Sequence, residues 1–227
     1  MIYNLSQMLV DKNINVTCAF SGIIDEDIKK KYKFDRINFI NTNILTSFRN
    51  KSLIFRFCFE ISTAIVLAVK CFFYFNKRKD LDLIIWYGPS VFLWIVVKAI
   101  NFSKKIPVYY ILRDIFPDWL ISLKVVKNFY IIWLLKKISN PQYAVSDVIG
   151  VEASENIIYL NKKGVKTKKI ELLPNWPNIV LCPNNKIDYK VKHDFNNAIN
   201  NAKEKNNITF VYIGNSSIAH DYNSLVE

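Results

Sequence analysis

Charged residues that could do chemistry cluster at Arg113-Asp114, and Asp118 and Trp119 follow closely. A guanidinium such as that of Arg113 can hold a phosphate or carboxylate, while a carboxylate such as that of Asp114 can orient a hydroxyl group or pair with the arginine. The two aspartates can equally cap the helix expected to follow. The residues alone favour neither interpretation.

Gly214-Asn215-Ser216 forms a second candidate loop, between a strand-like and a helix-like segment. Glycine lets a backbone approach a ligand closely, and the first turn of a helix offers unpaired N–H groups to a phosphate. An ordinary turn between a strand and a helix is the more frequent explanation of this pattern. His220 adjoins the loop, and a plain surface histidine is the simpler interpretation of it.

A third loop, Tyr87-Gly88-Pro89-Ser90, interrupts an apolar run. Ser90 can cap the next helix, and the loop can also line a cleft. Asp80 and Asp82 imitate a metal-binding Asp-x-Asp pair, but they precede a strand instead of following one. We therefore expect no metal and no cofactor.

Strand-like and helix-like runs alternate along the chain and must position these loops. This order predicts right-handed crossovers, a parallel sheet and a Rossmann-like α/β fold. Ligands of such sheets bind at the carboxyl ends of the strands, here after Trp86, Leu112 and Glu152. The expected strands are 15–20, 36–41, 81–86, 107–112, 147–152 and 169–173, and the expected helices are 1–12, 52–75, 91–102, about 118–138, and one capped by Ser154 and ended by Gly164.

The apolar run 53–75 is long enough to span a membrane. Arg56, Glu60, Thr63 and Lys70 interrupt it at intervals that place them on one stripe of a helix. This favours a helix packed on protein, with lipid contact as an option, over a membrane span.

The composition changes after residue 174. An Asn- and Pro-rich stretch precedes a polar helix, one strand and the start of another helix, and such a unit cannot bury its own faces. We therefore expect a Rossmann-like domain at 1–174, and a linker with the beginning of a second Rossmann-like domain at 175–227.

The net charge of +12 fits nucleic acid, an anionic membrane or a phosphorylated substrate. No DNA- or RNA-binding motif accompanies the lysines, so we expect no nucleic-acid partner. Lysines beside tryptophans and the apolar run 53–75 predict salt-dependent attachment to an anionic membrane. The four cysteines, which match no zinc or redox spacing, are expected to be buried free thiols.

Five stretches together resemble glycosyltransferase family 4, and within it the bacterial O-antigen and capsule transferases of the N-acetyl-L-fucosamine type. They are "DLDLIIWYGPS", "VYYILRDIFPDW", "ISNPQYAVSDVIGVEASENIIYLNKKGV", "KKIELLPNW" and "FVYIGNSSIAHDYNSLVE". They occur in the family's order and cover most of residues 80–227.

The resemblance implies a two-domain GT-B fold and a retaining, metal-independent transfer of sugar from a nucleotide sugar. The acceptor would be a polyprenyl-diphosphate-linked saccharide at the inner face of the cytoplasmic membrane. It implies donor-diphosphate contacts at Gly214, Asn215, Ser216 and His220, and an interdomain crossing at Pro174 and Asn175. It places Arg113 and Asp114 in the catalytic cleft, with Tyr87, Gly88, Ser90, Asp118 and Trp119 on the acceptor side.

The sequence also departs from the family. Many members have histidine where Arg113 stands, and because arginine is a poor general base, we expect Arg113 to act electrostatically. His220 replaces a residue that is often glutamine. A peripheral membrane or scaffold protein without catalysis is the alternative, and donor binding would separate the two.

We expect this chain alone not to transfer sugar. The family's first strand would precede Met1, and its paired glutamates would lie beyond Glu227, so the chain looks truncated at both ends. Purified chain given a panel of nucleotide sugars and a polyprenyl-diphosphate acceptor should yield no product above background. Clear turnover would contradict this expectation.

Overall fold

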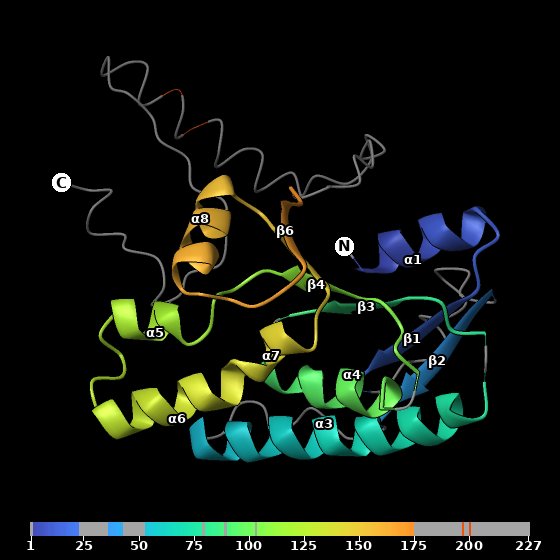
Figure 1. Cartoon of the computed structure of the whole chain (residues 1–227), viewed down its shortest axis with the longest axis horizontal. Coiled ribbons are helices and arrows are strands. Elements are labelled where there is room, and N and C mark those ends of the chain that lie inside the picture. Colours follow the sequence, from blue (N-terminus) through green and yellow to red (C-terminus); the bar gives the residue numbers. More distant parts are fainter. Residues whose placement is uncertain are drawn as a thin grey trace. The chain divides into compact units, whose positions relative to one another are not determined.

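The computed structural model describes residues 2–22, 36–42, 53–78, 80–88, 90–102 and 104–174, with Asn197 and Asn200 (Figure 1). The chain divides into two compact units, Met1–Pro177 and Asn178–Glu227. Apart from Asn197 and Asn200, all described residues belong to the first unit. The predicted strand and helices after residue 190 lie outside the described residues, those two asparagines excepted.

Four parallel strands form the larger sheet, in the order β3-β4-β5-β6. Their register pairs Ile84 with Val108, Tyr109 with Val148, and Val148 with Lys169, so all four strands end at the same edge. The strands are β3 (Ile84–Tyr87), β4 (Val108–Leu112), β5 (Val148–Val151) and β6 (Lys169–Leu172).

β1 (Val16–Phe20) and β2 (Ile37–Asn41) form a separate two-stranded parallel sheet. The predicted α/β class with parallel strands is therefore confirmed. The expectation of a single sheet is not, because no described strand pairs with the outer edge of β3. The predicted strand 81–86 also begins later than expected, at Ile84.

Helices precede or follow most of these strands, as the alternating pattern predicted. They are α1 (Ile2–Asp11), α3 (Leu53–Asn76), the 3₁₀ turn η3 (Val91–Leu93), α4 (Trp94–Ile100), α5 (Asp118–Ser122), α6 (Phe129–Ser139), α7 (Pro141–Ala144) and α8 (Ser154–Lys162).

The helix predicted over about 118–138 is two helices. The first helix, α5, ends at Ser122, and Lys124 just beyond it has a left-handed backbone (φ 55°) that does not continue a helix. The Asn128 side chain then accepts hydrogen bonds from the N–H groups of Tyr130 and Ile131, at 2.9 and 3.3 Å, and starts α6. The apolar period runs through both segments and hides this break.

The start of α8 also differs from the prediction. Ala153 occupies the N-cap position, and Ser154 is the first helical residue, with its hydroxyl bonded to the Glu155 carboxylate. Gly164 ends this helix as expected, in a left-handed backbone (φ 72°) that glycine adopts without strain.

Two aromatic side chains form the centre of the main core. Trp86 of β3 stacks on Tyr110 of β4, with ring centroids 3.7 Å apart. Both rings carry polar groups that find buried partners: the Trp86 indole donates to Ser146, and the Tyr110 hydroxyl bonds to Gln142. The stack therefore joins two strands to the segment around α7 without leaving either group unpaired.

Asp147 stabilises the opposite, amino-terminal edge of the sheet. Its carboxylate accepts a hydrogen bond from the Val108 N–H at 2.9 Å and pairs with Lys168 at 2.6 Å. The Lys168 contact, aided by the Val108 hydrogen bond, lowers the pKa of Asp147 from its ordinary value of 3.8. The ionised carboxylate therefore stabilises the folded chain.

Replacing Asp147 with asparagine tests this. A carboxyl group with a lowered folded pKa stabilises fully above its unfolded pKa, and loses that effect as the pH falls through the folded pKa. At pH 7 we expect Asp147→Asn to lower the melting temperature by about 2 °C. The difference should shrink in thermal melts as the pH falls below the ordinary carboxyl pKa of 3.8, and a gap that stays constant over that range would exclude the ionised carboxylate as its cause.

Candidate functional site

Three neighbouring strands bring charged and aromatic groups together at the carboxyl edge of the larger sheet. Tyr87 ends β3, Arg113 follows β4 and Glu152 follows β5. Arg113 forms an ion pair with Glu152, and its guanidinium carbon lies 6.0 Å from the centroid of the Tyr87 ring. This is the edge where parallel α/β sheets bind ligands.

Arg113 is the cation of this arrangement. Its side chain is only 17 % exposed and that of Glu152 is 32 % exposed, so the pair is partly shielded from water. A guanidinium has five N–H donors, and one carboxylate does not use them all. The arrangement can therefore hold an anion such as a phosphate, provided that the anion shares Arg113 with Glu152.

Glu152 was missed as a functional residue by the sequence reasoning, which counted it as the end of a strand. The observed strand β5 ends at Val151, so Glu152 opens the next loop. A usable signal existed, because a carboxylate directly after a buried apolar strand lies at the ligand edge of a parallel sheet. Asp114, next to Arg113, is exposed and open to a ligand.

Asp118 has a structural partner. Its carboxylate pairs with Lys163 at 2.5 Å, and both side chains are largely buried, at 16 % and 20 % exposed. The pair ties the start of α5 to the end of α8. The capping role suggested for Asp118 is wrong, because Pro117 is the N-cap residue of α5 and no side chain caps that helix.

Trp119, the next residue, is 43 % exposed. The structure thus separates the predicted set Arg113, Asp114, Asp118 and Trp119 into two parts. Arg113 and Asp114 lie at the open edge, and Asp118 is held in an internal ion pair.

The loop after β3 lies next to the core stack. The Gly88 N–H donates to the Ile111 carbonyl at 3.1 Å and extends the pairing of β3 with β4. Gly88 is buried, and Ser90 is the N-cap residue of η3. The proposed cap by the Ser90 hydroxyl is wrong, because its side chain makes no capping hydrogen bond.

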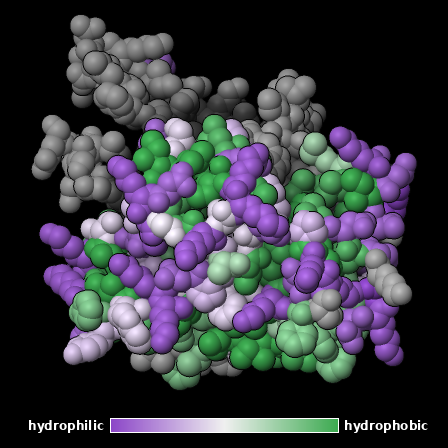
Figure 2. All heavy atoms as spheres, in the orientation of Figure 1, coloured by the Kyte–Doolittle hydropathy of each residue, from purple (hydrophilic) through white to green (hydrophobic). Residues whose placement is uncertain are grey.

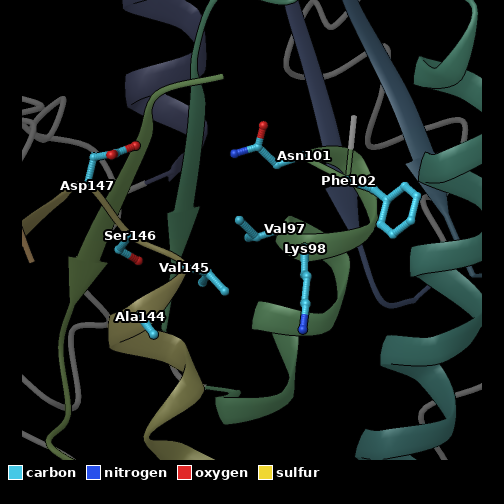
Figure 3. A pocket seen from close by; sticks show the side chains of 8 residues that line it. All are labelled: Val97, Lys98, Asn101, Phe102, Ala144, Val145, Ser146 and Asp147. Carbon is cyan, nitrogen blue, oxygen red and sulfur yellow. The ribbon is translucent and has the colours of Figure 1, made fainter. Parts of the chain in front are cut away.

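A hollow of about 370 Å³ lies at the other end of the sheet, between the end of α4 and the segment before β5 (Figure 3). Three of its polar side chains are hydrogen-bonded within the protein, and Lys98 also lines it. Asn101 bonds both backbone groups of Ile106, Asp147 holds Val108 and Lys168, and Ser146 bonds Gln142 and Trp86. This hollow contains none of the candidate residues.

The remaining predicted residues cannot be placed together. Gly214, Asn215, Ser216, His220 and Asn175 lie outside the described residues. Pro174 is exposed and follows Leu173, whose N–H donates to the Val151 carbonyl at 2.7 Å. Within the described residues, no group of three His, Cys, Asp or Glu side chains could hold a metal ion.

No protein-family model matches this chain, and no curated protein sequence matches it. The functional argument therefore depends on the residues of the carboxyl edge and on the five sequence stretches given above.

Gly88→Ala tests how closely this loop depends on the core. An added Cβ would lie 2.6 Å from the Tyr110 hydroxyl oxygen, and the ring cannot turn away because it is stacked on Trp86. The hydroxyl would have to leave Gln142, which costs about 1 to 3 kcal/mol for a buried group. Thermal melts should show a fall of several degrees.

Tyr110→Phe supplies the control, because it removes the crowded oxygen. The double variant Gly88→Ala/Tyr110→Phe should lose less stability than the two single variants added together. Strict additivity would show that the two residues do not interfere.

Proposed function

We propose that this chain provides the acceptor-side domain of a nucleotide-sugar-dependent glycosyltransferase of the GT-B fold. The transfer is retaining and metal-independent, and the acceptor is a polyprenyl-diphosphate-linked saccharide of O-antigen or capsule biosynthesis. The observation that carries the proposal is Arg113 at the carboxyl edge of a parallel sheet, inside a stretch that resembles glycosyltransferase family 4.

The site suits a substrate with a diphosphate group. Arg113 is permanently charged and partly shielded from water, and shielding strengthens its attraction for a phosphate. Since arginine cannot accept a proton at neutral pH, its role is to stabilise negative charge, including the charge that develops as the donor diphosphate leaves. Asp114, exposed beside it, orients the acceptor hydroxyl group.

The donor side of the proposal comes from the resemblance alone. In it, Gly214, Asn215, Ser216 and His220 hold the diphosphate of the nucleotide sugar, and the chain crosses between domains at Pro174 and Asn175. The parallel α/β architecture of the described residues is compatible with this arrangement. The nucleotide sugar is a substrate, so the proposal includes no separate cofactor.

The acceptor's lipid tail would bring the protein to the inner face of the cytoplasmic membrane. One observation also favours a second candidate, a non-catalytic peripheral membrane protein: helix α3 exposes large apolar side chains. The two candidates assign different roles to the carboxyl edge of the sheet, because that edge binds a ligand only in the glycosyltransferase.

Binding of a short-chain polyprenyl-diphosphate N-acetylaminosugar to the purified chain separates them. We expect saturable binding that needs the diphosphate, and therefore none to the corresponding free polyprenol. Arg113→Ala should raise the dissociation constant at least about tenfold, because it removes a charge-assisted contact. In a complete two-domain enzyme, the same change should slow transfer at least about tenfold.

Two further variants serve as controls for this binding test. Lys163→Ala breaks the internal pair with Asp118, so it should lower the melting temperature and leave acceptor binding nearly unchanged. Arg113→Ala/Glu152→Gln removes both charges of the edge pair, which guards against unfolding caused by an unpaired carboxylate. Undiminished binding by both Arg113 variants would overturn the proposed role of the edge.

A further inference from the structure

Helix α3 turns an apolar face to the outside. Phe55, Ile65, Val66, Val69 and Phe73 recur on one side of this 24-residue helix, and Phe73 is 71 % exposed. The segment Phe57–Asn76 is long and apolar enough to cross a membrane. Figure 2 shows apolar atoms along the lower margin, where Figure 1 places α3.

Two polar residues of α3 bond to groups of the protein itself. Thr63 is 4 % exposed, and its hydroxyl bonds the carbonyls of Phe59 and Glu60 in its own helix. Lys70 reaches back to the Asn41 carbonyl of β2 at 2.7 Å. Surface helices of water-soluble proteins normally expose a polar side, whereas the exposed side of α3 is mainly apolar.

The inner side of α3 is firmly packed. Leu67 and Cys71 are almost completely buried, in a cluster with Ile40 of β2 and Val96 of α4. Crossing a bilayer would require α3 to leave these contacts and to carry Lys70 into hydrocarbon. The helix therefore lies along a surface instead of spanning a membrane.

The exposed side continues onto α4 as an open apolar groove of about 460 Å³. Val69, Phe72 and Phe73 of α3 line it on one side, and Ile95 and Phe102 line it on the other. Phe102 is 79 % exposed. Side chains of this size in contact with water cost free energy unless something apolar covers them.

Helix α6 extends the apolar surface. Phe129, Tyr130, Trp133 and Leu134 are each roughly half exposed or more, from 48 % to 79 %. Both α3 and α6 contact η3. We call the exposed side chains of α3, the end of α4 and α6 the apolar face.

Basic residues border the apolar face. No acidic residue occurs between Asp118 and Asp147, a stretch that includes α6 and four lysines, Lys124, Lys127, Lys136 and Lys137. The Lys137 ammonium lies 4.8 Å from the centroid of the Trp133 ring, a pairing suited to the boundary between lipid tails and headgroups.

We propose that the apolar face is embedded in one leaflet of an anionic lipid bilayer, with α3 and α6 lying in the plane of the interface. Large apolar side chains enter the acyl boundary while the bordering lysines meet anionic headgroups, and this combination anchors interfacial helices. Charge complementarity selects the bilayer over a second copy of this chain, because two copies would bring like charges together.

The apolar face also reaches the candidate site. The Phe57 ring of α3 packs edge to face on Phe92 of η3, at 5.1 Å, and Phe92 follows Ser90 by two residues. One end of the embedded surface thus adjoins the loop after β3. This last step rests on the proposed function, since it gives a membrane-held acceptor a short path to Arg113.

Sedimentation with vesicles tests the proposal on the full chain. Vesicles of phosphatidylglycerol and phosphatidylcholine, without any glycolipid, should bind the wild type, more weakly at high salt. Val69→Glu/Phe73→Glu should weaken binding at least about tenfold, because it places charges at the acyl boundary. Ile158→Glu is the matched control, since Ile158 is 55 % exposed on α8, away from α3 (Figure 1), and it should bind as the wild type does.

An environment-sensitive fluorophore measures the orientation directly. Cys58 is an exposed free thiol on α3, contrary to the expectation that all cysteines are buried, and Cys71 is inaccessible. In a Cys18→Ser/Cys182→Ser background, a label on Cys58 should shift to the blue on vesicles and be quenched by spin-labelled acyl chains. A label at Ser154→Cys, in a background that also carries Cys58→Ser, should do neither.

Unchanged vesicle binding by Val69→Glu/Phe73→Glu, or a Cys58 label that stays in water, would overturn the proposal. A wild-type dimer that this variant converts to a monomer would assign the face to a second copy instead. Because the vesicles contain no glycolipid, these results are independent of acceptor binding. A chain that binds the soluble acceptor but not the vesicles would contradict the embedded apolar face and leave the proposed function intact.

Discussion

The in-register parallel pairing of β3, β4 and β5 is the constraint on which the candidate site depends. Because the strands run in one direction and end together, the sheet itself brings the residues that follow them to one edge. The stack of Trp86 on Tyr110 holds the first two strands together, and its hydrogen bonds fix both to the segment around α7. These contacts fix β4, and therefore the position of Arg113, which directly follows it.

Much of the architecture of the described residues follows from the sequence. Alternating apolar periods predicted the α/β class, the parallel direction and the edge where charged loops gather. Side-chain partnerships did not follow. Asp118 and Lys163 are 45 positions apart, and nothing in the local sequence of either residue specifies the other. The Arg113–Glu152 pair was hidden for the same reason, although each residue stands directly after a strand.

Helix α3 shows a second limit of prediction from the sequence. Its helical form was correctly predicted, but periodicity gives only the relative positions of residues around a helix. Which side turns inward depends on neighbours such as Asn41 and Val96, which contact α3 only in the folded chain. The break between α5 and α6 was missed because a left-handed Lys124 leaves no trace in an apolar pattern.

The Arg113–Glu152 pair has a consequence for selectivity. Glu152 is a resident counter-ion, so any ligand that reaches the guanidinium competes with a carboxylate already held in place. A singly charged anion gains little by that exchange, whereas a group with two or more negative charges gains more than the carboxylate gives up. Such an edge discriminates by charge, and it would favour a diphosphate over chloride and over carboxylates with a single charge.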